Sequence, residues 1–132
     1  MSENINKVWG ERRRIHLDDY NEIDLLYLKK DCFCSTHTHK SKANKFVGVS
    51  GHVRIETEFG NVDVKKNDIW TVYPPMKHRF YAVEDSVMIE FASTKDIPID
   101  PDDINRISQG GRIVEGKEMT LEQMREKGLL DL

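Results

Sequence analysis

The sequence predicts an all-β domain, a sandwich or a barrel, and three observations support this fold class. Between Ile23 and Phe91, short β-rich runs are separated by turn residues, a pattern typical of sandwiches and barrels. The chain has 132 residues, a length that suits one domain. It shows neither an internal repeat nor a low-complexity tract. One compact core is therefore expected, without a second domain.

The first strands are expected at residues 23–28, 32–39 and 46–49, where β-branched and aromatic residues cluster. The third of these runs ends at Ser50-Gly51, a turn pair. Beyond this turn, Val53, Ile55 and Thr57 alternate with charged residues. Such alternation predicts a strand with one buried face.

A hairpin is expected next, because Phe59-Gly60-Asn61 turns the chain and alternation resumes at Val62 and Val64. Lys66-Asn67-Asp68 marks a second turn, and the strand at residues 69–73 runs into Pro74-Pro75. Residues 80–83 and 87–91 form the last two expected strands. The barrel core is thus predicted over residues 23–92.

The two ends of the chain are expected to lie outside this core. Residues 1–22 are predicted as a polar N-terminal arm with Trp9 as its aromatic anchor. Residues 93–132 are predicted to wrap over the barrel, because Pro98 and Pro101 interrupt strand pairing. Near the end, Thr120-Leu121-Glu122-Gln123 has capping-box spacing, so a short helix is expected before Gly128.

The charge and composition exclude several partners. Twenty Lys and Arg against 23 Asp and Glu give a net charge of −3, so no basic excess favours nucleic acid. No run approaches the roughly 20 apolar residues of a membrane span, and the first residues lack signal-peptide features. We therefore expect a cytoplasmic protein without nucleic-acid or membrane partners. Cys32 and Cys34 are expected as reduced thiols, because positions i and i+2 rarely suit a disulfide.

The main chemical feature is His37-Thr38-His39. Two imidazoles at i and i+2 of a strand point to the same face and can bind one metal ion. His78, which follows Pro74-Pro75 at the start of a strand, is the candidate third ligand. Three neutral imidazoles suit zinc, iron, nickel, copper or manganese. By strand parity, Cys32 and Cys34 are expected to face away from this site unless a bulge intervenes.

These residues fall within two stretches that resemble the two sequence motifs of cupins. In the first stretch His37, His39 and Gly51 match, and Asn44 stands where that family has a glutamate. In the second stretch His78 matches, near Pro74-Pro75. The resemblance implies a single-domain jelly-roll (double-stranded β-helix) barrel. It also implies that His37, His39 and His78 bind a divalent metal inside the barrel, with Asn44 at the fourth position.

A narrower resemblance covers most of the chain. Trp9-Gly10 near the start, His78-Arg79, and Asp102-Asp103-Ile104-Asn105-Arg106 followed by Gly111-Arg112 are similar to segments of type II mannose-6-phosphate isomerases. The resemblance implies aldose–ketose isomerisation of a sugar phosphate in carbohydrate metabolism. It also suggests a homodimer paired through strand edges.

Isomerisation needs a base, and a metal to polarise the carbonyl group. Glu56, Glu58 and Glu90 are all available as the base. We expect Glu90, because it alternates with Ile89 and Phe91 and can face the barrel interior. A structural partner for an arginine is the alternative role of Glu90. Arg79 is the second catalytic candidate, and the candidate substrate-binding residues are Lys42, His52, Tyr73 and Arg106.

Two further functions stay open at this stage. A site of three histidines with Asn44 in place of glutamate also suits an iron dioxygenase. The second open function is that of a cupin that binds a sugar or another metabolite without catalysis, because a fold alone does not define a function.

Overall fold

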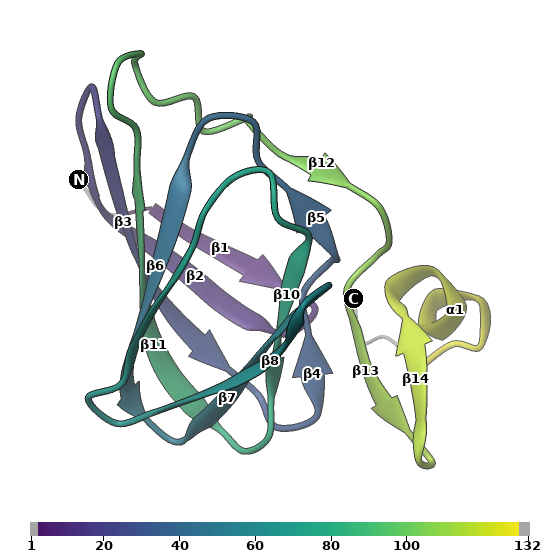
Figure 1. Ribbon diagram of the computed structural model, residues 1–132. Coiled ribbons are helices and arrows are strands. Elements are labelled where there is room, and N and C mark those ends of the chain that lie inside the picture. The colour runs from purple at the N-terminus through teal and green to yellow at the C-terminus, as the bar shows by residue number, and fades with distance from the viewer. Residues whose placement is uncertain (1–2, 130–132) are drawn as a thin grey trace.

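The computed structural model describes residues 3–129 and consists of two facing β-sheets and one short helix (Figure 1). The first sheet has six strands in the order β1-β2-β3-β11-β6-β9. These strands are β1 (Glu3–Lys7), β2 (Gly10–Leu17), β3 (Asn21–Leu28), β11 (Ser86–Ser93), β6 (Ala43–Ser50) and β9 (Ile69–Val72). All neighbouring pairs are antiparallel.

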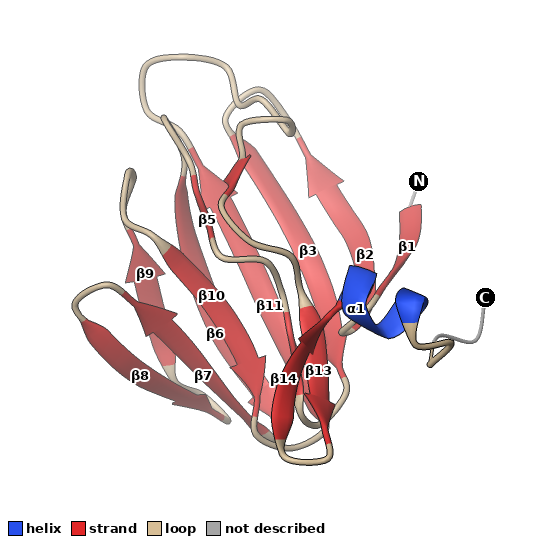
Figure 2. Ribbon diagram, turned by 90° about the vertical axis from the view of Figure 1, so that its right-hand side faces the viewer, coloured by secondary structure: helices blue, strands red, loops and turns tan. Residues whose placement is uncertain are grey.

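The second sheet has eight strands and faces the first (Figure 2). They are β12 (Asn105–Arg106), β5 (His37–Thr38), β10 (His78–Ala82), β4 (Cys32–Phe33), β13 (Gly111–Val114), β14 (Lys117–Thr120), β7 (His52–Thr57) and β8 (Gly60–Lys65). β10 pairs with β5, β4 and β7, so it lies at the centre of this sheet. The predicted all-β, single-domain jelly-roll barrel is confirmed.

The expected short helix is α1 (Leu121–Glu126). The Thr120 hydroxyl accepts a hydrogen bond from the Gln123 amide, and the Gln123 side chain accepts one from the Thr120 amide, which completes the predicted capping box. Met124 is fully buried and fixes the helix to the rest of the domain. Among the described residues, no helix is long and apolar enough to cross a membrane.

Two segments differ from the strand pattern expected from the sequence. Most of the expected N-terminal arm is a hairpin, β1–β2, that pairs with β3 and extends the first sheet. Trp9 packs edge-on against Phe80, with 4.9 Å between ring centroids, as expected of an anchor. The run 32–39 is split into β4 and β5 by irregular residues 34–36, which changes the direction in which its side chains point.

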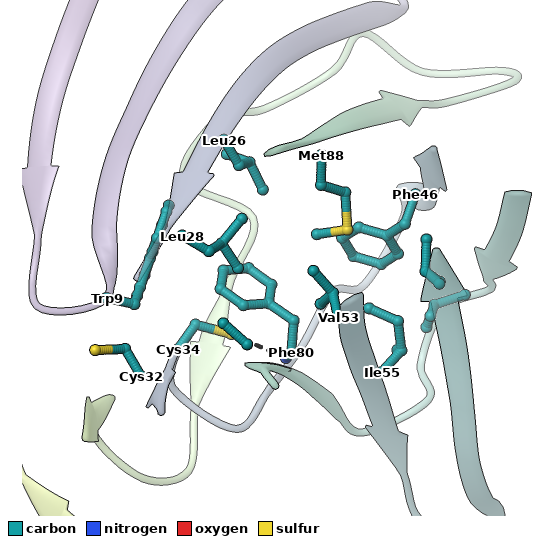
Figure 3. Packing of buried hydrophobic residues seen from close by; sticks show 13 residues of the cluster. Trp9, Leu26, Leu28, Cys32, Cys34, Phe46, Val53, Ile55, Phe80 and Met88 are labelled. Carbon is teal, nitrogen blue, oxygen red and sulfur yellow. Dashed lines mark hydrogen bonds between the residues drawn. The ribbon is translucent and has the colours of Figure 1, made fainter. Parts of the chain in front are cut away.

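The hydrophobic core lies between the two sheets (Figure 3). Leu26, Ile55 and Met88 are completely buried, and Phe46 is 1% exposed. They come from β3, β7, β11 and β6, so the core joins the sheets. Each such side chain contributes about 1.5–3 kcal/mol by leaving water.

Gly51 is required by the turn between β6 and β7. Its φ angle is +80°, and a Cβ atom there would lie 2.4 Å from the Asp85 carbonyl oxygen. Any other residue would be strained and would clash with the β10–β11 connection. The glycine therefore allows the chain to cross from one sheet to the other.

Candidate metal centre

The three predicted histidine ligands come together in the structure. His37 lies opposite His78 in the pairing of β5 with β10, and His39 follows β5 directly. One ring nitrogen from each residue lies within 4.8 Å of the other two. All three side chains are buried. The His-x-His spacing therefore places two imidazoles on one face, as expected.

Backbone carbonyl groups fix the tautomer of each imidazole. The Nδ1–H groups of His37, His39 and His78 donate to the carbonyl oxygens of Ser35 (2.8 Å), Asp103 (2.7 Å) and Met76 (3.0 Å), respectively. With the proton on Nδ1, each Nε2 carries a lone pair, the form in which histidine binds a metal.

Burial keeps the three rings neutral. Burial, together with the neighbouring His78 and His39, lowers the pKa of His37 to about 3. Burial also lowers the pKa of His39 to about 4, and that of His78 falls for the same reason. The Nε2 atom of His78 is buried without a hydrogen-bond partner. An unpartnered buried lone pair is costly, so a divalent cation fits this donor set.

Asn44 lies beside the histidines, but its amide nitrogen faces them. The Nδ2 group donates to His39 Nε2 at 3.0 Å and to Glu90 Oε2 at 2.8 Å. The Oδ1 atom is buried and has no partner. In this orientation Asn44 links His39 to Glu90. The predicted role of Asn44 as a fourth metal ligand stays a prediction, because it requires the amide to turn so that Oδ1 faces the metal.

A cavity of about 370 Å³ opens next to the cluster and is lined by His37, His39, Asn44 and Glu90. Burial, together with the nearby charge of Asp24, raises the pKa of Glu90 to about 7. Burial and Glu22 raise the pKa of Asp24 to about 6. The Asp24 Oδ1 atom has no hydrogen-bond partner. The cavity thus holds two carboxyl groups that titrate near neutral pH.

Cationic side chains lie close to Glu22, a third carboxyl group on the cavity wall. Arg14 donates to Glu22 at 2.7 Å, and the Lys42 ammonium lies 4.0 Å from the same residue. Lys42 and Arg106, both predicted to bind substrate, line the cavity. Lys7 and Arg12 line it as well. The cavity wall thus combines four cationic side chains with the carboxyl groups of Glu22, Asp24 and Glu90.

The structure does not bring Arg79, His52 and Tyr73 into this cavity. Arg79 follows His78 on β10 and so points to the opposite face, where it forms ion pairs with Glu56 (2.6 Å) and Glu118 (2.8 Å). His52 contacts Asp63 at 2.7 Å on the β7–β8 hairpin. Tyr73 is 66% exposed. Adjacent residues of a strand point to opposite faces, which explains why Arg79 lies outside the cavity although it follows His78 in the motif.

Several cavity residues were not predicted. Glu22 and Asp24 share the inner face of β3 with Leu26 and Leu28, so the i, i+2 pattern of that strand contained the signal. Arg12 comes from the segment expected as an arm. Cys34 also lines the cavity, contrary to the parity prediction, because residues 34–36 interrupt the strand. Both cysteines are free thiols, and burial raises the pKa of Cys34 to about 12.

Comparison with known proteins shows the fold but not the activity. No protein-family model and no curated protein matches this chain. Solved structures do match, and they are cupin-fold proteins. The likeness shows a cupin fold, and the three-histidine cluster offers donors that could hold a divalent metal ion.

Two of these structures illustrate the likeness. An oxalate decarboxylase from Bacillus subtilis superposes with a TM-score of 0.68 at 18% identity, over 80% of this chain and 30% of that one. Streptomyces Pac13, described as a nucleoside dehydratase, superposes with a TM-score of 0.69 at 14% identity, over 82% of this chain and 86% of its own. Neither is a mannose-6-phosphate isomerase, so that narrower resemblance stays a prediction.

Proposed function

We propose that this protein is a metal-dependent enzyme that moves a proton between adjacent carbons of a small anionic sugar, most simply an aldose–ketose isomerase acting on a sugar phosphate. One observation carries the proposal. Glu90, a carboxyl group with a pKa of about 7, faces the cavity and is joined through Asn44 to the histidine cluster. A base is most effective when its pKa lies near the working pH.

Each cavity residue has a role in this scheme. Glu90 removes the proton from the hydroxyl-bearing carbon next to the carbonyl group and returns it to the carbonyl carbon, while the proton of that hydroxyl group moves to the former carbonyl oxygen. A divalent ion held by His37, His39 and His78 would supply polarisation of the carbonyl oxygen. The unpartnered oxygen of Asp24 accepts a hydrogen bond from a substrate hydroxyl group, and Lys42 and Arg106 attract the phosphate.

The donor set favours one second candidate function. The cluster offers three neutral imidazoles and no carboxylate, a combination that leaves open coordination positions for iron and oxygen chemistry. A three-histidine dioxygenase is therefore the alternative to test. The likeness to Pac13, which has been solved with uridine, is a reason to include this nucleoside among the compounds tested.

Proton exchange with solvent tests the proposal directly. The protein is loaded separately with Zn²⁺, Mn²⁺, Fe²⁺ or Ni²⁺ and incubated in D₂O with mannose 6-phosphate, other sugar phosphates or uridine. With an aldose phosphate, NMR is expected to show loss of the proton next to the carbonyl group and formation of the ketose. Glu90→Gln is expected to abolish the exchange while metal binding persists, and Arg79→Lys, outside the cavity, is the matched control.

Other outcomes point elsewhere. Oxygen uptake with Fe²⁺ alone, without proton exchange, would replace the isomerase by the dioxygenase. Saturable binding of a sugar phosphate by calorimetry, with neither exchange nor oxygen uptake, would show a non-catalytic binding protein.

A further inference from the structure

Three cationic side chains from both sheets line one cavity. Lys7 is the last residue of β1, Arg12 lies on β2, and Arg106 lies on β12 of the second sheet. Arg12 is paired with Leu26, whose side chain is completely buried in the core. Paired residues of antiparallel strands point to the same face, so Arg12 points into the barrel. We call Lys7, Arg12 and Arg106 the cationic cluster.

The members of the cationic cluster lie close to one another. Burial, followed by the positive charges of Arg12 and Arg106, lowers the pKa of Lys7. Lys7 and Arg12 belong to one hairpin, in which Ile5 is paired with Arg12 and Lys7 follows Ile5 on the same strand face. Arg106 is exposed, so the cluster extends from the cavity wall to the solvent at the cavity mouth.

No carboxylate is in direct contact with the cationic cluster. Across residues 3–129, the side chains of its three members form neither an ion pair nor a hydrogen bond, and Arg12 Nε is buried without a partner. Glu22 is already paired with Arg14 at 2.7 Å. Burial raises the pKa of Asp24 and of Glu90, and the positive charge of Arg12 opposes this increase. Arg12 is therefore the member of the cluster nearest to the carboxyl groups.

The charge and geometry of the cationic cluster indicate its ligand. Three like charges on one cavity wall repel each other, and burial strengthens this repulsion. A phosphate monoester offsets it, because it carries about two negative charges at neutral pH and three acceptor oxygens. Arginine binds phosphate through two parallel hydrogen bonds. A carboxylate has half this charge and one oxygen fewer, so it leaves the cluster less well compensated.

The position of the cationic cluster also gives the ligand an orientation. With its phosphate group at the cavity mouth, a small ligand extends inward toward Glu90 and the histidines. The cavity volume of about 370 Å³ is within the usual range for small-molecule sites.

We propose that Lys7, Arg12 and Arg106 form the binding subsite for the phosphate group of a small phosphate monoester. This inference rests on the proposed function and deepens it, because it adds two residues of the β1–β2 hairpin to Arg106. The hairpin that the sequence suggests to be an arm becomes the part of the chain that selects phosphorylated substrates.

Binding measurements test the subsite independently of catalysis. Titration calorimetry with inorganic phosphate, mannose 6-phosphate and mannose is carried out on the protein with and without Zn²⁺. The wild-type protein is expected to bind mannose 6-phosphate at least about tenfold more tightly than mannose in both states. Lys7→Gln/Arg12→Gln is expected to weaken binding of both phosphates about a hundredfold, because each lost charged hydrogen bond costs about tenfold. Its metal affinity is expected to match that of wild type.

Arg13→Gln is the matched control. Arg13 lies on the same hairpin and carries the same charge, but it points to the outer face of the sheet. Its removal is expected to change phosphate affinity by less than about twofold. Arg12→Lys keeps the charge and loses the two parallel hydrogen bonds, so an intermediate loss of about tenfold is expected. Circular dichroism verifies that each variant is folded.

Several results would overturn the subsite. A wild-type protein that binds neither phosphate compound at about 10 mM is one, and a folded Lys7→Gln/Arg12→Gln variant that binds both as tightly as wild type is another. An equal loss in Arg13→Gln would indicate long-range attraction instead of a subsite. Phosphate binding that requires Zn²⁺ and does not depend on Lys7 and Arg12 would place the phosphate on the metal.

Proton exchange decides the proposed function separately. Phosphate selectivity that depends on Lys7 and Arg12, without proton exchange in D₂O, would keep the subsite and reject the isomerase. Exchange with no preference for phosphorylated sugars would keep the isomerase and reject the subsite.

Discussion

The barrel interior has an apolar half and a polar half, and three strands of the first sheet contribute to both. In the apolar half β3 contributes Leu26 and Leu28, β11 contributes Met88, and β6 contributes Phe46. In the polar half the same strands contribute Glu22, Asp24, Glu90 and Asn44. The change from one half to the other takes place within two residues of each strand.

The two halves have different roles: the apolar half stabilises the fold, and the polar half carries the groups that can bind a ligand. Apolar side chains of the first half are almost completely buried and stabilise the fold. The second half holds buried polar atoms without partners, Asp24 Oδ1, Asn44 Oδ1 and His78 Nε2. Such groups destabilise a fold, and their presence marks a region adapted to bind a ligand.

The largest expected effect is in the apolar half. Leu26→Ala removes a fully buried side chain and is expected to lower the free energy of unfolding by about 2–5 kcal/mol. Urea denaturation measures this difference. Phe59→Ala, at an exposed turn, is the control and is expected to change it by less than about 0.5 kcal/mol. Equal effects would contradict the assignment of the core.

Metal binding is the next test and concerns the polar half. A divalent ion at a hundred times its dissociation constant is expected to stabilise the wild-type protein by about 2.7 kcal/mol. His37→Ala/His39→Ala is expected to show no stabilisation, while His52→Ala, which removes only the contact with Asp63, keeps it. Calorimetric melts and elemental analysis measure both.

The pH dependence of this binding follows from the lowered pKa values of the histidines. Protons compete with metal only when they occupy the imidazole nitrogen. Since His37 and His39 have pKa values of about 3 and 4, affinity is expected to hold down to about pH 5. A loss of affinity centred near pH 6.5, the ordinary value for histidine, would show that the rings are not buried as described.

A smaller effect is expected for Glu90→Gln. The pKa of Glu90 rises from 4.5 to about 7 on folding, so between these values the folded state holds a proton that the unfolded state has lost. The free energy of unfolding therefore falls as pH rises through this window. Glutamine removes this loss, so the variant is expected to gain about 1–3 kcal/mol relative to wild type between pH 4.5 and pH 8.

Thermal or urea unfolding across this pH range measures the gain. Comparing variant with wild type cancels the contribution of the histidines, which both proteins share. Glu84→Gln, at an exposed carboxyl group, is the matched control and is expected to follow the wild-type profile. Parallel profiles for Glu90→Gln and wild type would place Glu90 in contact with water.

The smallest effect is expected for Arg79→Lys, on the outside of the barrel. Lysine loses the paired hydrogen bonds to Glu118 and the contact with Glu56, so unfolding is expected to become easier by about 0.5–1.5 kcal/mol. Metal affinity, measured by titration calorimetry, is expected to stay within twofold of wild type. A clear loss of metal affinity in this variant would show that Arg79 contributes to the metal centre.

Much of the fold could be predicted from local patterns. Alternation along β7 and β8, the turns between them and the capping box of α1 depend on neighbouring residues only, and all are found in the structure. The β1–β2 hairpin could not be predicted as a part of the sheet. Its polar residues resemble an exposed arm, yet Arg12 is polar because it lines the cavity.

In the candidate metal centre, too, some residues could be predicted from local sequence patterns and others could not. His37, His39 and His78 were predictable from spacing and resemblance, and Glu90 from alternation. The positions of Arg79 and Cys34 were not. Arg79 is adjacent to a ligand in sequence but on the other face of β10, and the break at residues 34–36 reverses the parity expected for Cys34. Long-range pairing decides such orientations.

The carbonyl group that orients His39 belongs to Asp103, 64 residues further along the chain. The Asp103 side chain also accepts hydrogen bonds from the backbone amides of Lys40 and Ser41. We therefore expect occupancy of the metal centre to be coupled to order in the segment around Asp103. Hydrogen–deuterium exchange of the amides near residues 100–106 is therefore expected to slow when metal binds, which makes this segment a reporter of the loaded state.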